Sequence, residues 1–252
     1  MKVVFVGAGP GDPDLMTVRA QRLVREARAC VFAGSLVDPR IVDLLPQGCE
    51  RTDSAPLALG GIVDALEDAA RRGLEPVRLQ TGDPSLYGAL REQIRELDRR
   101  GVPWEVVPGV SAFLAVAAAL GVELTVPGRS QAVVVCRAPG RTPVPAGQEP
   151  GNMARTGATV CVYLSSGRIL EDACRDLVDG YGRDAQAALV AEATRGNERV
   201  LRGPLSEIAA MAHEAGIERT ALLVAGPALE TGEESSLLYD AGFTHGHRRG
   251  AP

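Results

Sequence analysis

Residues 2–17, KVVFVGAGPGDPDLMT, join a short apolar run to a loop in which glycines occupy alternate positions. An apolar run that ends in glycine is typical of a buried parallel strand followed by a tight turn. Loops of this kind hold phosphate groups in dinucleotide-binding proteins, so the nature of the ligand is the first question that this sequence raises.

The loop departs from the dinucleotide fingerprint G-x-G-x-x-G at its third glycine position. Gly7 and Gly9 match the first two positions, whereas Asp12 takes the third and Pro10 stiffens the turn. A carboxylate there would repel a pyrophosphate, and the chain has no G-K-[ST] sequence of the other common phosphate loop. A nicotinamide-dependent oxidoreductase is therefore disfavoured. A tight turn without a ligand also explains the glycines, but it does not explain the acidic character of the loop.

The composition is that of a globular protein with a net negative charge. Of the 252 residues, 45% are hydrophobic and 23% are charged, and the net charge is −5. This charge and the aromatic content of 4% argue against a nucleic-acid partner, which calls for a basic face and stacking platforms. The longest nearly apolar stretch, residues 110–122, is shorter than the roughly 20 residues of a membrane-spanning helix, so we expect no membrane partner.

The cysteines and histidines give no sign of a disulfide framework or a metal site. The five cysteines form no C-x-x-C pair, and two of the three histidines, His245 and His247, lie in a polar tail. Cysteines in apolar surroundings are typical of buried thiols in a reducing compartment. The apolar part of the first twelve residues is too short for a secretory signal. We therefore expect a cytoplasmic protein without a bound metal.

Apolar runs alternate with helical periodicities along the chain, which predicts an α/β fold with a mostly parallel sheet. We expect two α/β lobes, residues 1–121 and 122–230, with a proline- and glycine-rich segment of little regular structure at 138–157 and a flexible tail at 231–252. The predicted strands are residues 2–6, 29–33, 76–80, 104–107, 131–136, 158–164, 187–193, 198–203 and 221–226. The predicted helices are residues 16–27, 62–70, 86–97, 110–120, 169–178 and 205–215.

Two further loops follow predicted strands in the same way as the first. In TGDPSLYG, residues 81–88, Asp83 is a good N-cap and Pro84 suits the first position of a helix. In PGVSAF, residues 108–113, glycine and a small hydroxyl residue again separate a strand from a helix. Open α/β sheets bind ligands at the carboxyl ends of their strands. Three small, rigid loops in these places predict a shared binding edge.

These motifs, in this order and at these spacings, resemble the tetrapyrrole methylases from residue 2 to about 229. That family contains enzymes of vitamin B12 and siroheme synthesis that use S-adenosylmethionine. The resemblance implies two α/β lobes with the cofactor in the cleft between them, and a homodimer. Within the family, CRAPGRTPVP at 136–145 and FAGSLV at 32–37 are similar to the branch that methylates carbon 11 of precorrin-4. The branch that methylates uroporphyrinogen has an aspartate-containing segment where this chain has Ala33 and Gly34.

The resemblance also implies which residues contact S-adenosylmethionine, the methyl donor. Motif positions shared with the family fall on all three loops and on two short motifs of the second lobe, VYLSS and AEAT. These positions are Pro10, Thr81, Gly82, Asp83, Leu86, Ser111, Ala112, Leu164 and Ala193.

The acceptor would be a tetrapyrrole with several carboxylates, which calls for cationic partners. Arg129, Arg137 and Arg141 are the candidates, with Tyr87 beside the second loop; solvated loop arginines and a half-buried tyrosine are the plainer alternatives. No nucleophile stands in a recognisable constellation, so the sequence names no catalytic residue. The competing interpretations are a methyltransferase of this fold for another corrin carbon or for RNA, the oxidoreductase, and a binding module without activity.

Overall fold

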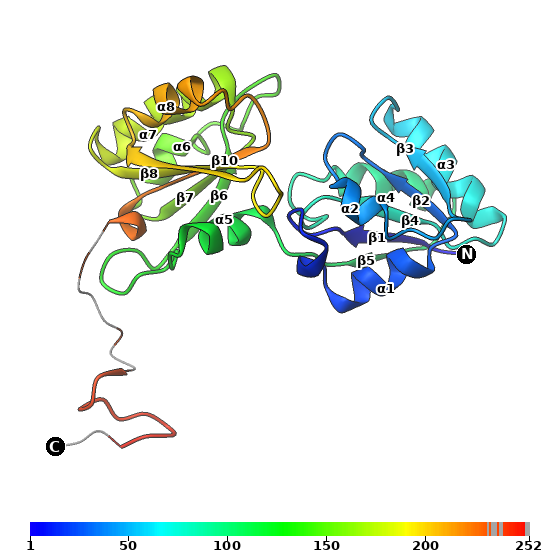
Figure 1. Cartoon of the computed structure of the whole chain (residues 1–252), viewed down its shortest axis with the longest axis horizontal. Coiled ribbons are helices and arrows are strands. Elements are labelled where there is room, and N and C mark those ends of the chain that lie inside the picture. The colour runs from blue at the N-terminus through cyan, green and yellow to red at the C-terminus, as the bar shows by residue number, and fades with distance from the viewer. Residues whose placement is uncertain (231, 233–235, 237–238, 250–252) are drawn as a thin grey trace. The chain divides into compact units, whose positions relative to one another are not determined.

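The computed structural model describes residues 1–230, 232, 236 and 239–249. Contacts divide the chain into two compact units, and we describe each by itself (Figure 1). The first unit contains Met1–Val116 and Glu192–Glu198, and the second contains Ala117–Ala191 and Arg199–Pro252. The predicted flexible tail, 231–252, lies partly outside the described residues.

The first unit is built on a parallel five-stranded sheet in the order β3-β2-β4-β1-β5. The register pairs Val4 with Val77 and Gly7 with Gln80, so the loops after β1 and β4 leave the sheet side by side. Four of the strands match predicted ones, but the polar and largely exposed β3 was not predicted. The strands are β1 (Val3–Gly7), β2 (Ala29–Phe32), β3 (Glu50–Asp53), β4 (Val77–Gln80) and β5 (Trp104–Val107).

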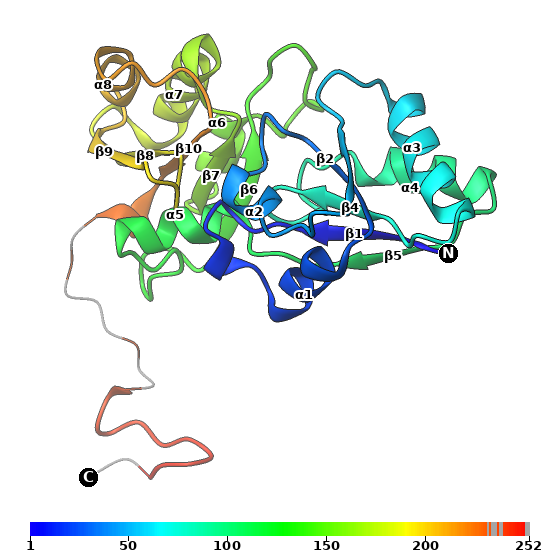
Figure 2. The ribbon, with the colours of Figure 1, turned by 45° about the vertical axis from the view of Figure 1, so that its right-hand side comes forward.

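Helices cover both faces of this sheet, as its apolar strands require. Buried side chains of α1 and α2 pack on one face in a cluster around Val4, Val6 and Leu79. Those of α3 and α4 pack on the other face around Val3 and Phe5; α1 lies on one side of the sheet and α3 and α4 on the other (Figure 2). The helices are η1 (Pro13–Leu15), α1 (Val18–Glu26), α2 (Pro39–Val42), α3 (Leu59–Arg71), α4 (Leu90–Arg99) and α5 (Ala112–Leu120), of which α5 continues into the second unit.

The second unit contains a mixed sheet in the order β6-β7-β10-β8-β9. Only β6 and β7 pair in parallel, and the other three pairs of neighbours are antiparallel. The expectation of a mostly parallel sheet is therefore wrong for this unit. No helix separates β8 from β9, so these two strands must run in opposite directions. The strands are β6 (Val133–Arg137), β7 (Thr159–Tyr163), β8 (Gln186–Ala191), β9 (Arg199–Pro204) and β10 (Ala221–Ala225).

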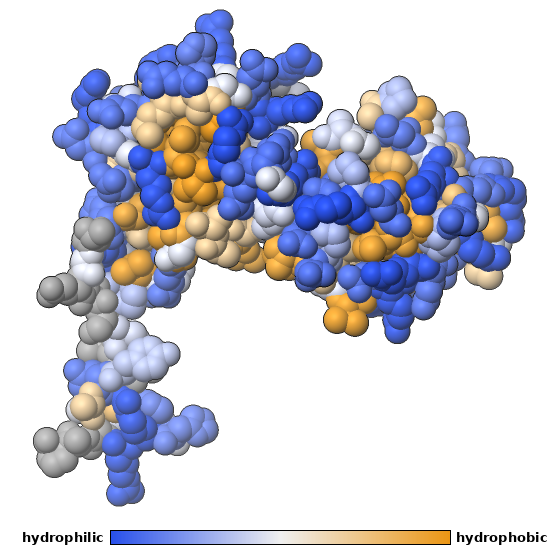
Figure 3. Space-filling model, in the orientation of Figure 1, coloured by the Kyte–Doolittle hydropathy of each residue, from blue (hydrophilic) through white to orange (hydrophobic). Residues whose placement is uncertain are grey.

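The helices α6, α7 and α8 pack on one face of the second sheet, around a core that includes Val160, Leu177 and Leu189. The short α6 falls inside the proline- and glycine-rich segment 138–157, where we expected little regular structure. Pro150 stands at the start of α6, where its missing N–H leaves no hydrogen bond unmade. Apolar residues also gather on the visible surface over this sheet (Figure 3). The helices are α6 (Pro150–Ala154), α7 (Gly167–Tyr181), α8 (Ile208–Glu214) and η2 (Pro227–Leu229).

The second predicted loop differs from its prediction at the helix that follows it. Asp83 does not cap α4, which begins at Leu90 behind Ala89. Tyr87 and Ala89 have positive φ angles of 57° and 48°, and a left-handed residue interrupts a right-handed helix. Residues 83–86 instead form a separate turn, in which the backbone N–H of Leu86 donates to the Asp83 carbonyl.

The Gly109→Ala variant should unfold more easily than the natural chain. A Cβ at Gly109 would overlap the carbonyl oxygen of Gly82 and lie 2.8 Å from the Gly7 Cα. We expect the free energy of unfolding in urea to fall by about 1–3 kcal/mol. Gly60→Ala on α3 is the matched control, because a Cβ there meets nothing within 4 Å. It should leave stability unchanged or raise it by up to ~1 kcal/mol; an equal loss in both variants would contradict this account.

Candidate functional site

The three predicted loops meet at the carboxyl edge of the first sheet. The backbone N–H of Gly9 donates to the Gly82 carbonyl oxygen at 3.2 Å, and the N–H of Gly82 donates to the Gly9 carbonyl oxygen at 2.7 Å. This reciprocal pair continues the β1–β4 pairing beyond the strands and joins the first loop to the second. The first two loops therefore share one edge of the sheet, as the sequence predicts; that this edge binds a ligand stays a prediction.

Close packing of glycines brings the third loop against the other two. A Cβ added at Gly7 would lie 2.5 Å from the Gly109 backbone nitrogen and 2.8 Å from the Gly82 carbonyl oxygen. Real Cβ contacts do not come this close, so Gly7 and Gly109 need the bare backbone of glycine, whereas Gly82 needs it for its positive φ of 63°. The result is an edge formed mainly of backbone, with few side chains in the way of a ligand.

Asp83 fastens the second loop to the third. One carboxylate oxygen accepts hydrogen bonds from the backbone N–H and the hydroxyl of Ser85, and the other accepts from the Gly109 N–H at 2.9 Å. Partial burial disfavours the charged carboxylate, but these hydrogen bonds outweigh that effect and hold the pKa of Asp83 below its ordinary value. Both oxygens are thus already engaged within the protein, which the sequence did not indicate.

The other donor-contacting residues predicted on the three loops lie along the same edge. Pro10 and Gly82 are buried, and Ser111 is 6% exposed. Thr81 is exposed, and its hydroxyl is free of hydrogen bonds within the described part of the chain. Leu86 and Ala112 are half-buried on the second and third loops.

The segment Glu192–Glu198, which connects β8 to β9, contributes to the first unit and docks on its first loop. The Thr194 Oγ1 accepts a hydrogen bond from the backbone N–H of Asp12 at 3.0 Å. A Cβ at Gly11 would lie 2.8 Å from the Arg195 Cγ, so this glycine leaves room for the segment. The predicted donor contact Ala193 is thereby placed in the same unit as the three loops.

Charged groups anchor this segment. Asp38, 6% exposed, binds Arg40 at 3.0 Å and lies 3.9 Å from the Arg195 Nε. The Arg40 guanidinium also donates to the Thr194 carbonyl oxygen, and that of Arg195 to the Leu36 carbonyl oxygen. Burial raises the pKa of Asp38, but its bonds from Arg40 outweigh burial and lower it. The sequence gives little sign of this group, because Asp38, Arg40 and Arg195 are far from the first loop or from one another along the chain.

The remaining predicted residues lie in the second unit, apart from Tyr87. Leu164 follows β7 with a φ of 59° and a side chain that is 62% exposed. Arg129 pairs with Glu230 at 3.1 Å. Arg137 donates to the carbonyl oxygens of Thr142 and Pro143 and so shapes the chain that follows β6.

Arg141 and Tyr87 present their side chains to solvent. Within the described residues the Arg141 guanidinium takes part in no ion pair, and its side chain is exposed. Tyr87 is 46% exposed at the end of the second loop. Of the three arginines predicted to contact the acceptor, Arg141 is thus the one that forms no ion pair or side-chain hydrogen bond with the described residues.

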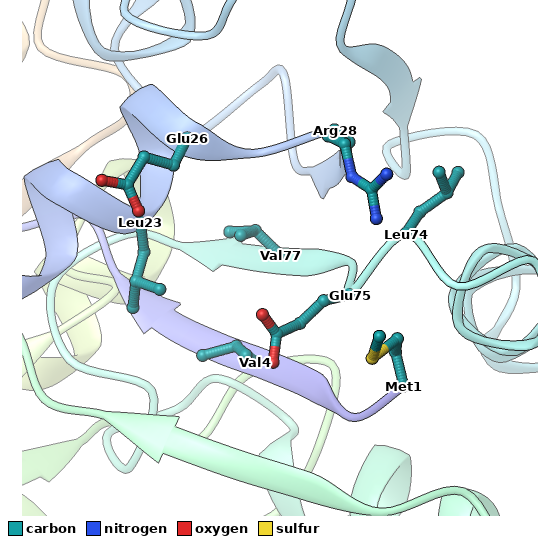
Figure 4. A pocket seen from close by; sticks show the side chains of 8 residues that line it. All are labelled: Met1, Val4, Leu23, Glu26, Arg28, Leu74, Glu75 and Val77. Carbon is teal, nitrogen blue, oxygen red and sulfur yellow. The ribbon is translucent and has the colours of Figure 1, made fainter.

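We also searched the described residues for a metal site, a membrane-spanning helix, reactive cysteines and cavities. They hold no cluster of acidic, histidine or cysteine side chains suited to a metal, and no helix among them could cross a membrane. All five cysteines are free, and burial raises the pKa of Cys30 to about 12. A cavity of about 140 Å³ lies at the amino ends of β1 and β4, bordered by Val4, Glu75 and Val77 (Figure 4). It lies at the opposite edge of the sheet from the three loops.

Comparisons with known proteins agree with this arrangement. Residues 2–209 match the family described as Tetrapyrrole (Corrin/Porphyrin) Methylases. Precorrin-4 C(11)-methyltransferase of Rhodococcus erythropolis is 45% identical over 243 residues, covering 96% of this chain and 97% of that protein. The X-ray structure of a cobalt precorrin-4 methyltransferase, a cobalamin biosynthetic enzyme, superimposes with a TM-score of 0.87 at 36% identity, covering 91% and 96% of the two chains.

A second solved structure is that of uroporphyrin-III C-methyl transferase from Thermus thermophilus in complex with S-adenyl homocysteine. It matches with a TM-score of 0.76 and 31% identity, covering 91% of this chain and 99% of that one. The family match and these relatives make the chain a methyltransferase of the tetrapyrrole class. The chain belongs to the tetrapyrrole methylase family.

The link made by Asp83 predicts a pH-dependent loss of stability. Since the pKa of Asp83 is lower in the folded than in the unfolded chain, its contribution is present above the ordinary carboxyl pKa and is lost as the pH falls through the folded value. Asp83→Asn should lower the free energy of unfolding by about 1–2 kcal/mol at pH 7, and the difference from the natural chain should shrink below about pH 4.

Urea unfolding at several pH values measures this difference. Asp14→Asn, an exposed neighbour in η1, serves as the control and should differ little from the natural chain at any pH. A constant deficit of Asp83→Asn across the whole range would show that the carboxylate charge does not stabilise the loops.

Proposed function

We propose that this chain transfers a methyl group from S-adenosylmethionine to carbon 11 of precorrin-4 or of cobalt-precorrin-4, a step of cobalamin biosynthesis. The observation that carries the proposal is the 45% identity with a precorrin-4 C(11)-methyltransferase over nearly the full length of both chains. The segment at 136–145 supports the same branch from the sequence. The residues of this chain do not distinguish a metal-free from a cobalt-containing substrate, because the metal would be bound by the substrate and would need no protein ligands.

The edge of the first unit suits a donor of this kind. Gly7, Gly82 and Gly109 pack so closely that they leave bare backbone at the edge, and the hydroxyls of Thr81 and Ser111 lie beside it. Under this proposal Pro10, Thr81, Gly82, Leu86, Ser111, Ala112 and Ala193 contact the donor, Leu164 is a further contact from the second unit, and Asp83 holds the loops that do so.

When bound, S-adenosylmethionine supplies a methyl group already activated by the positive sulfur. The C–S bond breaks as a C–C bond forms to the electron-rich ring carbon, and the electron pair of the C–S bond stays on sulfur. The chain then has to orient the two reactants and exclude water, which accounts for large rate gains without a nucleophile. This division of work fits loops that consist of rigid backbone.

The proposed contacts with the acceptor depend on the attraction between arginine side chains and the carboxylates of the tetrapyrrole. Arg141 and the half-exposed Tyr87 are the proposed contacts for the tetrapyrrole, whose carboxylates suit a guanidinium. Arg129 and Arg137 are already bonded to Glu230 and to loop carbonyls, so for them we propose mainly a structural part in shaping this region. The net charge of −5 supports a small-molecule acceptor over RNA.

The finer expectations from the sequence remain proposals. We propose a cytoplasmic homodimer that binds no nucleic acid, supported by the family resemblance and by apolar residues on the visible surface of the second unit (Figure 3). We also propose that residues 1–121 and 122–230 are the two domains of the chain.

The product identifies the reaction. Purified chain incubated with methyl-labelled S-adenosylmethionine and precorrin-4 should yield a tetrapyrrole that carries one added methyl group. Mass spectrometry counts the methyl groups, and carbon NMR of the label should place the new one at carbon 11. A label at another ring position, or on structured RNA offered in parallel, would contradict the proposal. A rise in melting temperature with NADH but not with S-adenosylhomocysteine would favour the oxidoreductase.

Arg141→Ala should weaken binding of the tetrapyrrole without affecting the donor. Losing one carboxylate contact at an exposed site costs about 1 kcal/mol, which corresponds to a rise in the acceptor KM of about fivefold. Arg175→Ala on α7 is the matched control, because Arg175 is an exposed arginine paired with Asp172. An unchanged KM in Arg141→Ala, or an equal rise in both variants, would remove Arg141 from the site.

A further inference from the structure

A buried arginine lies beneath the second loop. Arg78, on β4, is 6% exposed, and among the described residues no carboxylate forms an ion pair with it. Its Nε donates to the Gln93 Oε1 at 2.9 Å, and one terminal nitrogen donates to the Ser54 Oγ at 3.0 Å and to the Val31 carbonyl oxygen at 3.2 Å. Burial lowers the pKa of Arg78. All of these hydrogen-bond partners are neutral.

Gln93 carries this network to the turn before α4. Its side-chain amide donates to the carbonyl oxygens of Gly88 at 3.3 Å and of Ala89 at 3.1 Å. The side chain of Gln80 donates to the same Gly88 carbonyl, and its own Oε1 is buried with no partner in the described part of the chain. Gln93 and Gln80 are 2% and 7% exposed, so two buried amides hold one turn.

The turn needs to be held because its backbone is strained. Tyr87 and Ala89 both adopt the left-handed conformation, which is costly for a residue with a Cβ. Gly88 between them fits because a Cβ there would lie 2.6 Å from the Pro84 carbonyl oxygen. Such conformations persist where the surroundings fix them, and they are concentrated at functional sites. The strained turn carries the half-exposed ring of Tyr87.

Ordinary core packing does not explain the network. A leucine at position 93 would fill a similar volume, but it would leave the buried Arg78 Nε without its acceptor and would remove the hydrogen bonds to both carbonyls. What the polar side chains add is the pair of hydrogen bonds to the carbonyls of Gly88 and Ala89. The Arg78 guanidinium fixes which end of the Gln93 amide faces those carbonyls, because its Nε–H requires the oxygen.

We propose that Gln93, oriented by Arg78, is a positioning residue for methyl transfer, which fixes the left-handed turn that presents the Tyr87 ring to the tetrapyrrole. The inference rests on the proposed function, because it takes a flat, carboxylate-bearing macrocycle as the acceptor. An aromatic ring held in one place provides apolar contact to such a macrocycle at little entropic cost. The donor edge is fastened separately through Asp83 and Gly109, so losing the network should affect the acceptor and spare the donor.

Gln93→Glu separates positioning from stability. The glutamate keeps an acceptor for Arg78 and pairs with its charge, but as a carboxylate it donates nothing to Gly88 and Ala89. We expect the acceptor KM to increase about tenfold, the dissociation constant of S-adenosylhomocysteine to stay within about twofold, and any fall in melting temperature to be smaller than that of Val63→Ala. Val63→Ala on α3 is the converse control, with a core cavity that lowers stability and leaves both binding constants unchanged.

Coupling to Tyr87 completes the test. If Gln93 acts through the ring, Tyr87→Ala should raise the acceptor KM by itself, and adding Gln93→Glu should raise it no further. Effects that multiply in the double variant, or a Gln93→Glu enzyme with the natural acceptor KM, would overturn the proposal.

A measurement without substrate distinguishes failure of this inference from failure of the proposed function. Fluorotyrosine is incorporated at the four tyrosines, and the fluorine resonance of Tyr87 is assigned by its loss in Tyr87→Phe. We expect this resonance to shift or broaden in Gln93→Glu and to stay in place in Val63→Ala. If precorrin-4 is not methylated, the proposed function fails while this readout still tests the turn; an unmoved resonance in Gln93→Glu would overturn the inference whatever the enzyme methylates.

Discussion

The contact of backbone with backbone at Gly7, Gly82 and Gly109 is the constraint on which the first unit depends. Because Gly7 and Gly109 have no side chains, their loops approach each other and the Gly82 carbonyl oxygen more closely than a Cβ permits. The reciprocal hydrogen bonds of Gly9 and Gly82 extend the sheet register into the loops. The geometry of the edge therefore follows from the sheet, because these hydrogen bonds and contacts tie the loops to β1, β4 and β5.

Polar side chains around this edge serve mainly to hold backbone. Asp83 ties the second loop to the third, and Thr194 ties the segment Glu192–Glu198 to the first. Behind the second loop, Arg78 binds the side-chain oxygen of Gln93, and the Gln93 amide donates to carbonyl groups of the strained turn. Each of these polar groups has its hydrogen bonds inside the protein. A search for exposed acids and bases would pass over them, although they determine where the exposed groups lie.

Most strands and the three loops of the first unit could be predicted from the sequence, because each is encoded by residues that are neighbours in the chain. Apolar runs that end in glycine identify β1 and its loop, and the same pattern identifies the loops after β4 and β5. Properties that depend on distant residues were not predictable. The antiparallel pairing of β10 with β7 and β8 has no local signature. Asp83 reads as a helix cap from its neighbours, whereas its second oxygen binds Gly109, 26 residues away. The docking of Thr194 on Asp12 spans 182 residues.

The chemistry of the family explains why such a site has few reactive side chains. A methyl group on a positive sulfur needs no activation by the protein, so an acid or base aimed at it adds nothing to the displacement. Rate then depends on holding two large ligands in line, and small errors of position are costly. At this edge the glycine backbone is held by close packing and by hydrogen bonds, so its position does not depend on side-chain rotamers. The buried guanidinium and amides extend the same rigidity to the turn at Tyr87, where glycine alone would leave the aromatic ring free to move.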